Sequence, residues 1–186
     1  LGTDTRVMIA RRSLDQLTLI ALALGRTYPG LANPNDFTVR SVTSTNVFKL
    51  SAAKGKFVAL HFLLKTECPY CLRHTREYAK RAGGDTNVVH IFLKPDTDEE
   101  IKGWATKLGD GAPKLEIYRD PDAGLAKAFG LPGGYKFHGQ TVHFPGLILL
   151  DTEGKEVFRY VGKNNSDRLP YEKFSEKVKE LMPRHP

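Results

Sequence analysis

The sequence predicts a layered α/β domain with a mixed central sheet flanked by helices. Segments with the pattern of buried strands alternate with segments of helical character, which is typical of parallel strands joined by crossover helices. Near the end of the chain, two strand segments are separated only by a tight turn, so they are expected to add an antiparallel hairpin. The 186 residues, with 40% hydrophobic and 26% charged side chains, have the composition of one globular domain with some extra decoration.

Residues 1–35 are expected to form an N-terminal helical extension and linker. The segment 10–25 favours a helix with Ser13 as its cap, and a run rich in Pro, Gly and Asn follows it. The alternative is part of a secretory signal, because Arg11 and Arg12 precede an apolar stretch. As a helix, the segment would pack on the domain or on a second copy, which would give a homodimer. The compartment stays open between cytoplasmic and periplasmic or exported.

The domain itself is expected to span residues 36–186. It opens with two short strands at 37–42 and 46–50, where apolar and polar residues alternate. The segment 56–64 is almost continuously apolar, as a central strand covered on both faces requires. A helix rich in Arg, Lys, Glu and Ala follows over 72–81 and ends at a pair of glycines.

The alternation of strands and helices continues through the second half of the domain. Another buried strand is expected at 88–93. Thr97 with Glu100 three residues later is the capping-box signal for a helix over 98–108. The remaining expected elements are a strand at 114–118, a short helix at 122–129, hairpin strands at 147–150 and 156–160, and an amphipathic helix at 171–181.

Composition argues against several classes of function. The net charge is +7, but the basic residues form no long block and no nucleic-acid motif accompanies them, so no nucleic-acid partner is expected. No run of about 18 apolar residues is present, so no membrane span is expected. A structural zinc site needs four ligands, and His90, His138 and His143 show no recognised ligand spacing. We therefore expect neither a metal nor another cofactor.

The two cysteines, Cys68 and Cys71, are the residues that carry chemistry. They lie too close together to join distant parts of the fold, so they are better suited to a reaction than to a structural role. Cys68 follows a buried strand and leads a helix, whose first amide groups carry partial positive charge and stabilise a thiolate. Pro69 suits the first helical turn because it has no amide hydrogen to lose. We expect an exposed, nucleophilic Cys68 and a less exposed, resolving Cys71.

Charged residues near the motif are expected to tune the thiolate. Lys65 precedes Cys68 and Arg73 follows it, and both favour a lowered pKa, whereas Glu67 opposes this effect. Only charges within about a Debye length of the sulfur matter.

Three segments together resemble the thioredoxin-like redoxins, which include the alkyl hydroperoxide reductase/thiol-specific antioxidant group and exported thioredoxin-like reductants. These segments are 36–39, 55–62 and the Cys-Pro-Tyr-Cys run at 68–71. Downstream, 120–131 looks like the peroxiredoxin-type insert, and 144–155 looks like the proline strand and hairpin of the family. The resemblance covers about residues 36–183 and implies a thioredoxin-like fold.

The resemblance also implies where a partner docks. Pro145 would be a cis-proline facing the disulfide, and a cis bond would leave the backbone of Phe144 free to pair with an extended partner chain. The alternative is an ordinary trans proline at the start of a strand. Pro69 and Tyr70 would complete the docking surface.

The peroxide-binding pattern of peroxiredoxins is not reproduced. That pattern places Thr or Ser three residues before the peroxidatic cysteine and Pro four residues earlier, where this chain has Lys65 and His61. Counting from Cys71 does not restore the pattern, and Thr66 would fit only if the loop were shifted.

His61 lies on the strand that leads to the motif, near the place where thioredoxins hold a buried acid. Two interpretations stay open. His61 is either a proton acceptor for Cys71 or a hydrogen-bonded histidine on a strand face.

These observations favour a thiol–disulfide oxidoreductase that acts on a protein disulfide or dithiol. The partner's extended chain would dock near Pro145, and the sequence identifies neither the external reductant nor the direction of exchange. One alternative is a peroxiredoxin-like thiol peroxidase that reduces hydroperoxides, in which Cys68 forms a sulfenic acid and Cys71 condenses with it. A second alternative is a redox-inactive thioredoxin-fold binding module that holds its partner through the positive surface or the leading helix.

Overall fold

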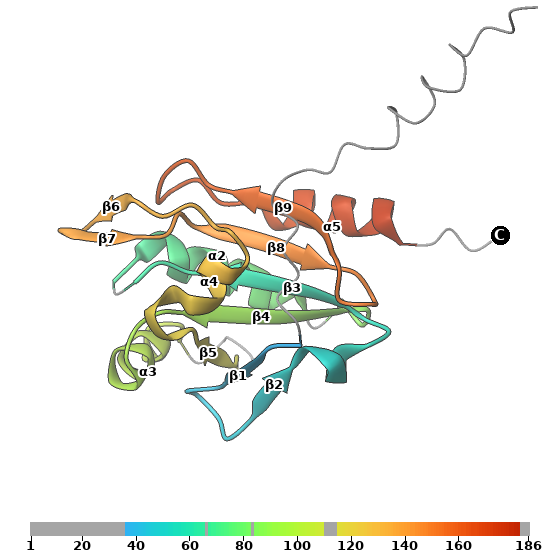
Figure 1. The fold of residues 1–186 in the computed structure, drawn as a ribbon, viewed down its shortest axis with the longest axis horizontal. Coiled ribbons are helices and arrows are strands. Elements are labelled where there is room, and N and C mark those ends of the chain that lie inside the picture. Colours follow the sequence, from blue (N-terminus) through green and yellow to red (C-terminus); the bar gives the residue numbers. More distant parts are fainter. Residues whose placement is uncertain (1–35, 66, 83, 110–114, 183–186) are drawn as a thin grey trace, which may run out of the picture.

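A five-stranded mixed sheet forms the centre of the molecule (Figure 1). The computed structural model describes residues 36–65, 67–82, 84–109 and 115–182. Across the sheet, the strands are β5 (Ile117–Arg119), β4 (Val88–Lys94), β3 (Phe57–Phe62), β8 (Gly146–Leu150) and β9 (Glu156–Val161). β3, β4 and β5 run parallel, whereas β8 is antiparallel to both β3 and β9. The predicted mixed sheet is therefore confirmed.

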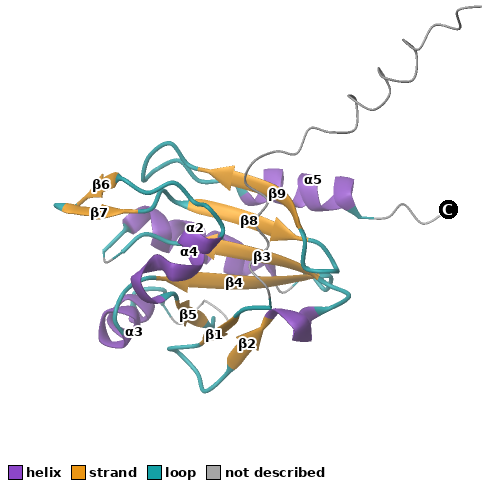
Figure 2. Cartoon of the chain, viewed as in Figure 1, coloured by secondary structure: helices purple, strands orange, loops and turns teal. Residues whose placement is uncertain are grey.

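Helices cover one face of this sheet, and a mixed layer covers the other (Figure 2). The first face packs against α2 (Pro69–Ala82), α3 (Asp98–Thr106) and α5 (Tyr171–Leu181). The second packs against β1 (Thr38–Arg40), β2 (Val47–Lys49), the 3-10 helices η1 (Leu50–Ala53) and η2 (Pro121–Ala123), and α4 (Gly124–Ala128). Every residue of β3 is buried, because side chains that alternate along it enter one core or the other. The nearly continuous apolar run of β3 is the consequence of this two-sided burial.

Local sequence signals account for the ends of several elements. The Thr97 hydroxyl accepts a hydrogen bond from Glu100 N, and the Glu100 carboxylate accepts one from Thr97 N, so the predicted capping box is formed. α5 has the predicted bounds of 171–181. β1 and β2 pair with each other in a separate two-stranded sheet, which is linked to the central sheet by an isolated antiparallel bridge between Ser41 and Tyr118 of β5.

A second small hairpin was not predicted. β6 (Tyr135–Phe137) and β7 (Gln140–Val142) pair antiparallel between α4 and β8. Their two-residue turn consists of His138 (φ 47°) and Gly139 (φ 73°). Positive φ angles at both central residues are typical of the type I′ turn, which is common in two-residue hairpins.

The expected extension over residues 1–35, including its helix at 10–25, lies outside the described residues. Within the part of the chain that is described, no helix is both long and apolar enough to cross a membrane.

Candidate active site

The two cysteines form a disulfide at the junction between β3 and α2, with their Cα atoms 5.1 Å apart. α2 begins at Pro69, and Leu72 N donates to Cys68 O over 3.1 Å in the first helical turn. Cys68 is thus the cap residue of the helix, and its Sγ accepts a hydrogen bond of 3.0 Å from Cys71 N. A Cys68 sulfur in this place meets the positive end of the helix, which favours a thiolate there when the disulfide is reduced.

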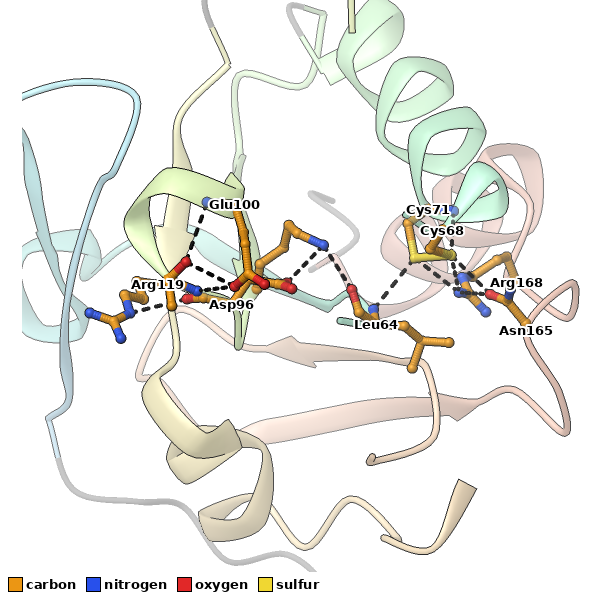
Figure 3. Close-up of polar contacts among 10 residues, drawn as sticks. Leu64, Cys68, Cys71, Asp96, Glu100, Arg119, Asn165 and Arg168 are labelled. Atoms are coloured by element: carbon orange, nitrogen blue, oxygen red, sulfur yellow. Dashed lines mark hydrogen bonds and ion pairs between the residues drawn. A yellow bond between two sulfur atoms is a disulfide. The ribbon is translucent and has the colours of Figure 1, made fainter. Parts of the chain in front are cut away.

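A buried ion pair holds the segment that leads into the motif. Leu64 N lies 3.4 Å from Cys71 Sγ, and Lys94 Nζ donates to Leu64 O over 2.8 Å (Figure 3). Lys94 pairs with Asp96 at 3.0 Å, and both side chains are fully buried. Burial lowers the pKa of Lys94, and its ammonium also lies 4.7 Å from the centre of the Trp104 ring. These contacts fix the approach of β3 to the disulfide.

The loop between β9 and α5, residues 162–170, covers the disulfide, and we call it the cover loop. Its Asn165 Oδ1 lies 2.9 Å from Cys68 Sγ. Its Arg168 Nη2 lies 3.3 Å from Cys71 Sγ and 3.7 Å from Cys68 Sγ (Figure 3). One guanidinium therefore contacts both sulfurs.

Within the described residues, the groups that accept hydrogen bonds from Arg168 are all neutral. Nη2 donates to Asn165 Oδ1 over 3.1 Å, and Nη1 donates to the Asp167 carbonyl oxygen over 3.2 Å. Nε is buried without a hydrogen-bond partner among the described residues. Burial lowers the pKa of Arg168 to about 10, so the group remains charged at neutral pH.

The cover loop is held by its own polar side chains and by the unpredicted hairpin. The Asn164 side chain accepts hydrogen bonds from the backbone amides of Ser166 and Asp167. Asn165 N donates to the hydroxyl of Tyr135, on β6, over 2.8 Å. The loop is thereby fixed in place over the sulfurs.

The prediction of an exposed Cys68 is wrong for this disulfide form. Cys68 and Cys71 are both 0% exposed. The cover loop contributes to this burial, because Asn165 and Arg168 contact the sulfurs.

The other residues expected around the motif differ in exposure and in the groups that they contact. Pro69 is exposed, and Tyr70 is 36% exposed at the start of α2. The guanidinium of Arg73 lies over the Tyr70 ring, 5.2 Å from its centre, and thus forms a cation–π contact with Tyr70. Lys65 is half-buried, and Thr66 lies outside the described residues. The charge that contacts the sulfurs comes from the cover loop instead.

His61 belongs to a chain of three histidines, in which His61 and His74 are buried and His90 is half-buried. His61 Nδ1 is 3.0 Å from His74 Nε2, and His61 Nε2 is 3.0 Å from His90 Nδ1. His90 Nε2 lies 3.4 Å from Asp85 Oδ2, nearer the surface. Both ring nitrogens of His61 are thus engaged by other histidines, and no cluster of metal-ligating side chains occurs in the described part of the chain. A role for His61 in proton transfer with Cys71 stays a prediction.

The expectation of a cis bond at Pro145 is wrong, because the described residues contain no cis peptide bond. Phe144 N donates to Pro132 O over 2.8 Å, and Phe144 O lies 2.7 Å from His143 Nδ1. Pro145 O accepts a hydrogen bond from Gly162 N, at the start of the cover loop. These backbone groups are therefore engaged within the chain, and they are not free to pair with a partner strand. The internal partners are Pro132 and His143, which lie on either side of the β6–β7 hairpin, and Gly162 of the cover loop.

Asn165 and Arg168 were missed in the sequence. They follow the motif by 97 and 100 positions, and a polar turn segment before the last helix carries no local sign of proximity to cysteine. Only the tertiary fold brings them to the sulfurs.

The fold and the disulfide together define a thioredoxin-like redox protein. A model of the AhpC/TSA family matches residues 31–157, and the chain belongs to that family. This membership, with a cysteine pair joined at the start of α2, places the chain among the thiol oxidoreductases. The search of curated proteins gave no match.

Solved structures share the fold at low sequence identity. A peroxiredoxin-like protein from Aquifex aeolicus has a TM-score of 0.65 and 16% identity, covering 79% of this chain and 84% of that one. The pneumococcal exposed lipoprotein thioredoxin from Streptococcus pneumoniae has a TM-score of 0.57 and 25% identity, covering 78% and 99%. A secreted Mycobacterium tuberculosis disulfide oxidoreductase homologous to E. coli DsbE has a TM-score of 0.58 and 14% identity, covering 78% and 96%.

Proposed function

We propose that this protein is a thiol–disulfide oxidoreductase that exchanges the Cys68–Cys71 disulfide with a protein partner. One observation carries the proposal. The pair is joined at a helix N-terminus, where the Cys71 amide and the Arg168 guanidinium both contact the sulfur of Cys68. These groups stabilise the thiolate that exchange chemistry requires.

The exchange runs through a mixed disulfide. The Cys68 thiolate attacks a sulfur of the partner disulfide, and the other partner sulfur leaves as a thiolate. Cys71 Sγ, three residues on and within bonding reach, then attacks Cys68 Sγ and releases the second partner sulfur. Two electrons pass to the partner, and the proton of Cys71 is released. The reverse sequence oxidises a partner dithiol by the same steps.

The partner is proposed to dock beside the disulfide. Pro69 and Tyr70 are exposed next to Cys68, and Tyr70 is one of the few large apolar side chains with this exposure. Phe144 is half-buried, and Pro145 lines a small cavity with Arg168. Since the Phe144 backbone is engaged, an extended partner chain would be held here by side-chain contacts and not by strand addition.

The test is reduction of an insulin-type disulfide by the wild-type protein and by Cys68→Ser and Cys71→Ser variants. Serine replaces sulfur by oxygen at nearly unchanged size, so a loss of activity reports on chemistry. We expect both variants to lose turnover. Wild-type rates in both variants would reject the proposal.

A thiol peroxidase is the second candidate, and the AhpC/TSA membership together with the Arg168 contact favours it. The Cys68 thiolate would attack a hydroperoxide and break its O–O bond, which gives a sulfenic acid and releases an alcohol, or water from hydrogen peroxide. Cys71 would then convert the sulfenic acid to the disulfide with release of water. Lys65 and His61 in place of the peroxidatic Thr and Pro speak against it. Stopped-flow consumption of hydrogen peroxide no faster than that of a free thiol would eliminate this candidate.

A further inference from the structure

We propose that Arg168 makes the Cys68–Cys71 pair an electron acceptor, so that the exchange equilibrium favours transfer of its disulfide to partner dithiols over reduction of partner disulfides. This inference rests on the proposed function and adds the direction of exchange to it.

The first step concerns the disulfide form, in which no carboxylate of the described residues is in ion-pair contact with Arg168, although the Asp167 carboxylate acts on its charge from a longer distance. Arg168 forms no ion pair with a carboxylate of the described residues. The nearby Asp167 carboxylate is instead engaged by the Tyr160 hydroxyl and by Lys163 N. A disulfide is neutral and offers only weak acceptors to a guanidinium. A largely buried cation with no anion in direct contact is less well compensated than one that is paired, and this destabilises the state that contains it.

The second step concerns the reduced form, which supplies the missing anion. Arg168 Nη2 lies within hydrogen-bond range of Cys71 Sγ, at 3.3 Å, and near Cys68 Sγ, at 3.7 Å, so a thiolate on either sulfur pairs with it. Arg168 supplies this positive charge, because His74 is neutral at neutral pH. The carboxylate of Glu67, which adjoins Cys68, is paired with Lys107. Reduction therefore removes an electrostatic mismatch, which stabilises the dithiol relative to the disulfide and makes the pair more oxidising.

The reaction in the disulfide-donating direction uses Arg168 at both bond-breaking steps. A partner thiolate attacks Cys68 Sγ, the bond to Cys71 Sγ breaks, and Cys71 leaves as a thiolate beside the guanidinium. The second partner thiolate then attacks the partner sulfur of the mixed disulfide, and Cys68 leaves as a thiolate. Two electrons move from the partner dithiol to this pair. One partner proton ends on Cys71, and the other goes to solvent while Cys68 stays ionised.

The first experiment equilibrates the protein with reduced and oxidised glutathione and measures the fraction of disulfide after acid quench and alkylation. Arg168→Gln should shift the equilibrium at least about tenfold toward the disulfide, which corresponds to a potential lowered by about 30 mV. Arg168→Lys keeps a charge without the planar fork and should give a smaller shift. Arg76→Gln, which removes the same charge from a side chain bound to Leu108 O, should give none.

The second experiment uses only wild-type protein, so it holds even where a variant fails to fold. The oxidised protein is mixed with an equimolar amount of reduced thioredoxin, and we expect the thioredoxin to end oxidised. A pair that remains disulfide-bonded against thioredoxin, or an Arg168→Gln equilibrium within about twofold of wild type, overturns the inference while exchange itself still occurs. An absence of exchange with both glutathione and thioredoxin rejects the proposed function instead.

Discussion

Three neighbouring histidines, one each on β3, α2 and β4, are neutral in the folded protein at neutral pH. Burial lowers the pKa of His61, His74 and His90, and for His74 it lowers the pKa to about 3. In the unfolded chain, the same side chains protonate near their ordinary pKa of 6.5. Below this pH the unfolded state therefore binds more protons than the folded state, and the fold loses stability as the pH falls.

The free energy of unfolding should fall as the pH is lowered from about 6.5 to about 5.5, by up to about 1.4 kcal/mol per pH unit for each histidine. Urea unfolding at a series of pH values measures this slope. The His61→Phe variant should give a shallower slope. His138→Asn should leave it unchanged, because His138 is exposed and its φ of 47° suits Asn. A wild-type stability that stays constant over this range would contradict the account.

The sequence identifies those site residues that are contiguous along the chain. Cys68, Pro69 and Cys71 follow a recognisable buried strand and begin a recognisable helix, so their surroundings could be predicted from local pattern. Arg168 and Asn165 could not, because their position depends on how the β9–α5 connection crosses the molecule. The bonding of the Phe144 backbone escaped prediction for the same reason, since its partners come from other loops.

At the scale of elements, the cover loop contacts both sulfurs, and we expect it to limit access to the disulfide. Its first residue, Gly162, packs so closely that an added Cβ would overlap the Asp167 carbonyl oxygen and lie 3.0 Å from Pro145 Cγ. Only a glycine fits this approach without movement of the loop backbone. The loop geometry over the sulfurs therefore depends on one residue that lacks a side chain.

The Gly162→Ala variant should displace the cover loop and expose the disulfide. We expect a loss of about 1–3 kcal/mol in stability from overpacking, together with faster reduction of the disulfide by dithiothreitol. Stopped-flow reduction and urea unfolding measure the two effects. Gly133→Ala is the matched control, because nothing lies within 4 Å of its added Cβ. Equal reduction rates for Gly162→Ala and wild type would show that the loop does not limit access.

Helices with a clear capping or amphipathic pattern could be predicted from the sequence, whereas the three-residue strands β6 and β7 could not. The capping box and the amphipathic pattern locate α3 and α5 well. The hairpin β6–β7 has strands of three residues each, and its His138-Gly139 turn lacks the common Asn-Gly or Asp-Gly signal. This missed hairpin matters for the site, because its Tyr135 holds the cover loop.

At the scale of the whole molecule, the site lies at the end of β3, the strand from which the chain builds the sheet first toward one edge and later toward the other. From β3 the chain passes through α2 to β4 and β5 on one side, whereas β8 and β9 extend the sheet on the other. Loops from both halves meet at the carboxyl end of β3, as they do at switch points in open α/β sheets. The cysteines come from the first half of the chain and the Arg168 cover from the second.

The oxidation state should change the stability of the whole fold. If the folded protein favours the dithiol through Arg168, then reduction stabilises the fold relative to the disulfide form, or leaves it nearly unchanged. A structural disulfide, by contrast, typically contributes about 2–4 kcal/mol. Urea unfolding of oxidised and reduced protein at neutral pH gives the comparison, and the Arg168→Gln variant should favour the oxidised form more than wild type does. An oxidised wild-type protein that is more stable by several kcal/mol would contradict this expectation.

The most direct test of the central claim is to trap the mixed disulfide. The Cys71→Ser variant is incubated with a peptide that contains a disulfide, and the products are mapped by mass spectrometry without reductant. We expect one peptide bound covalently to Cys68, and no adduct in the Cys68→Ser, Cys71→Ser double variant. A Cys71→Ser protein that forms no adduct under these conditions would contradict the assignment of Cys68 as the exchanging thiol.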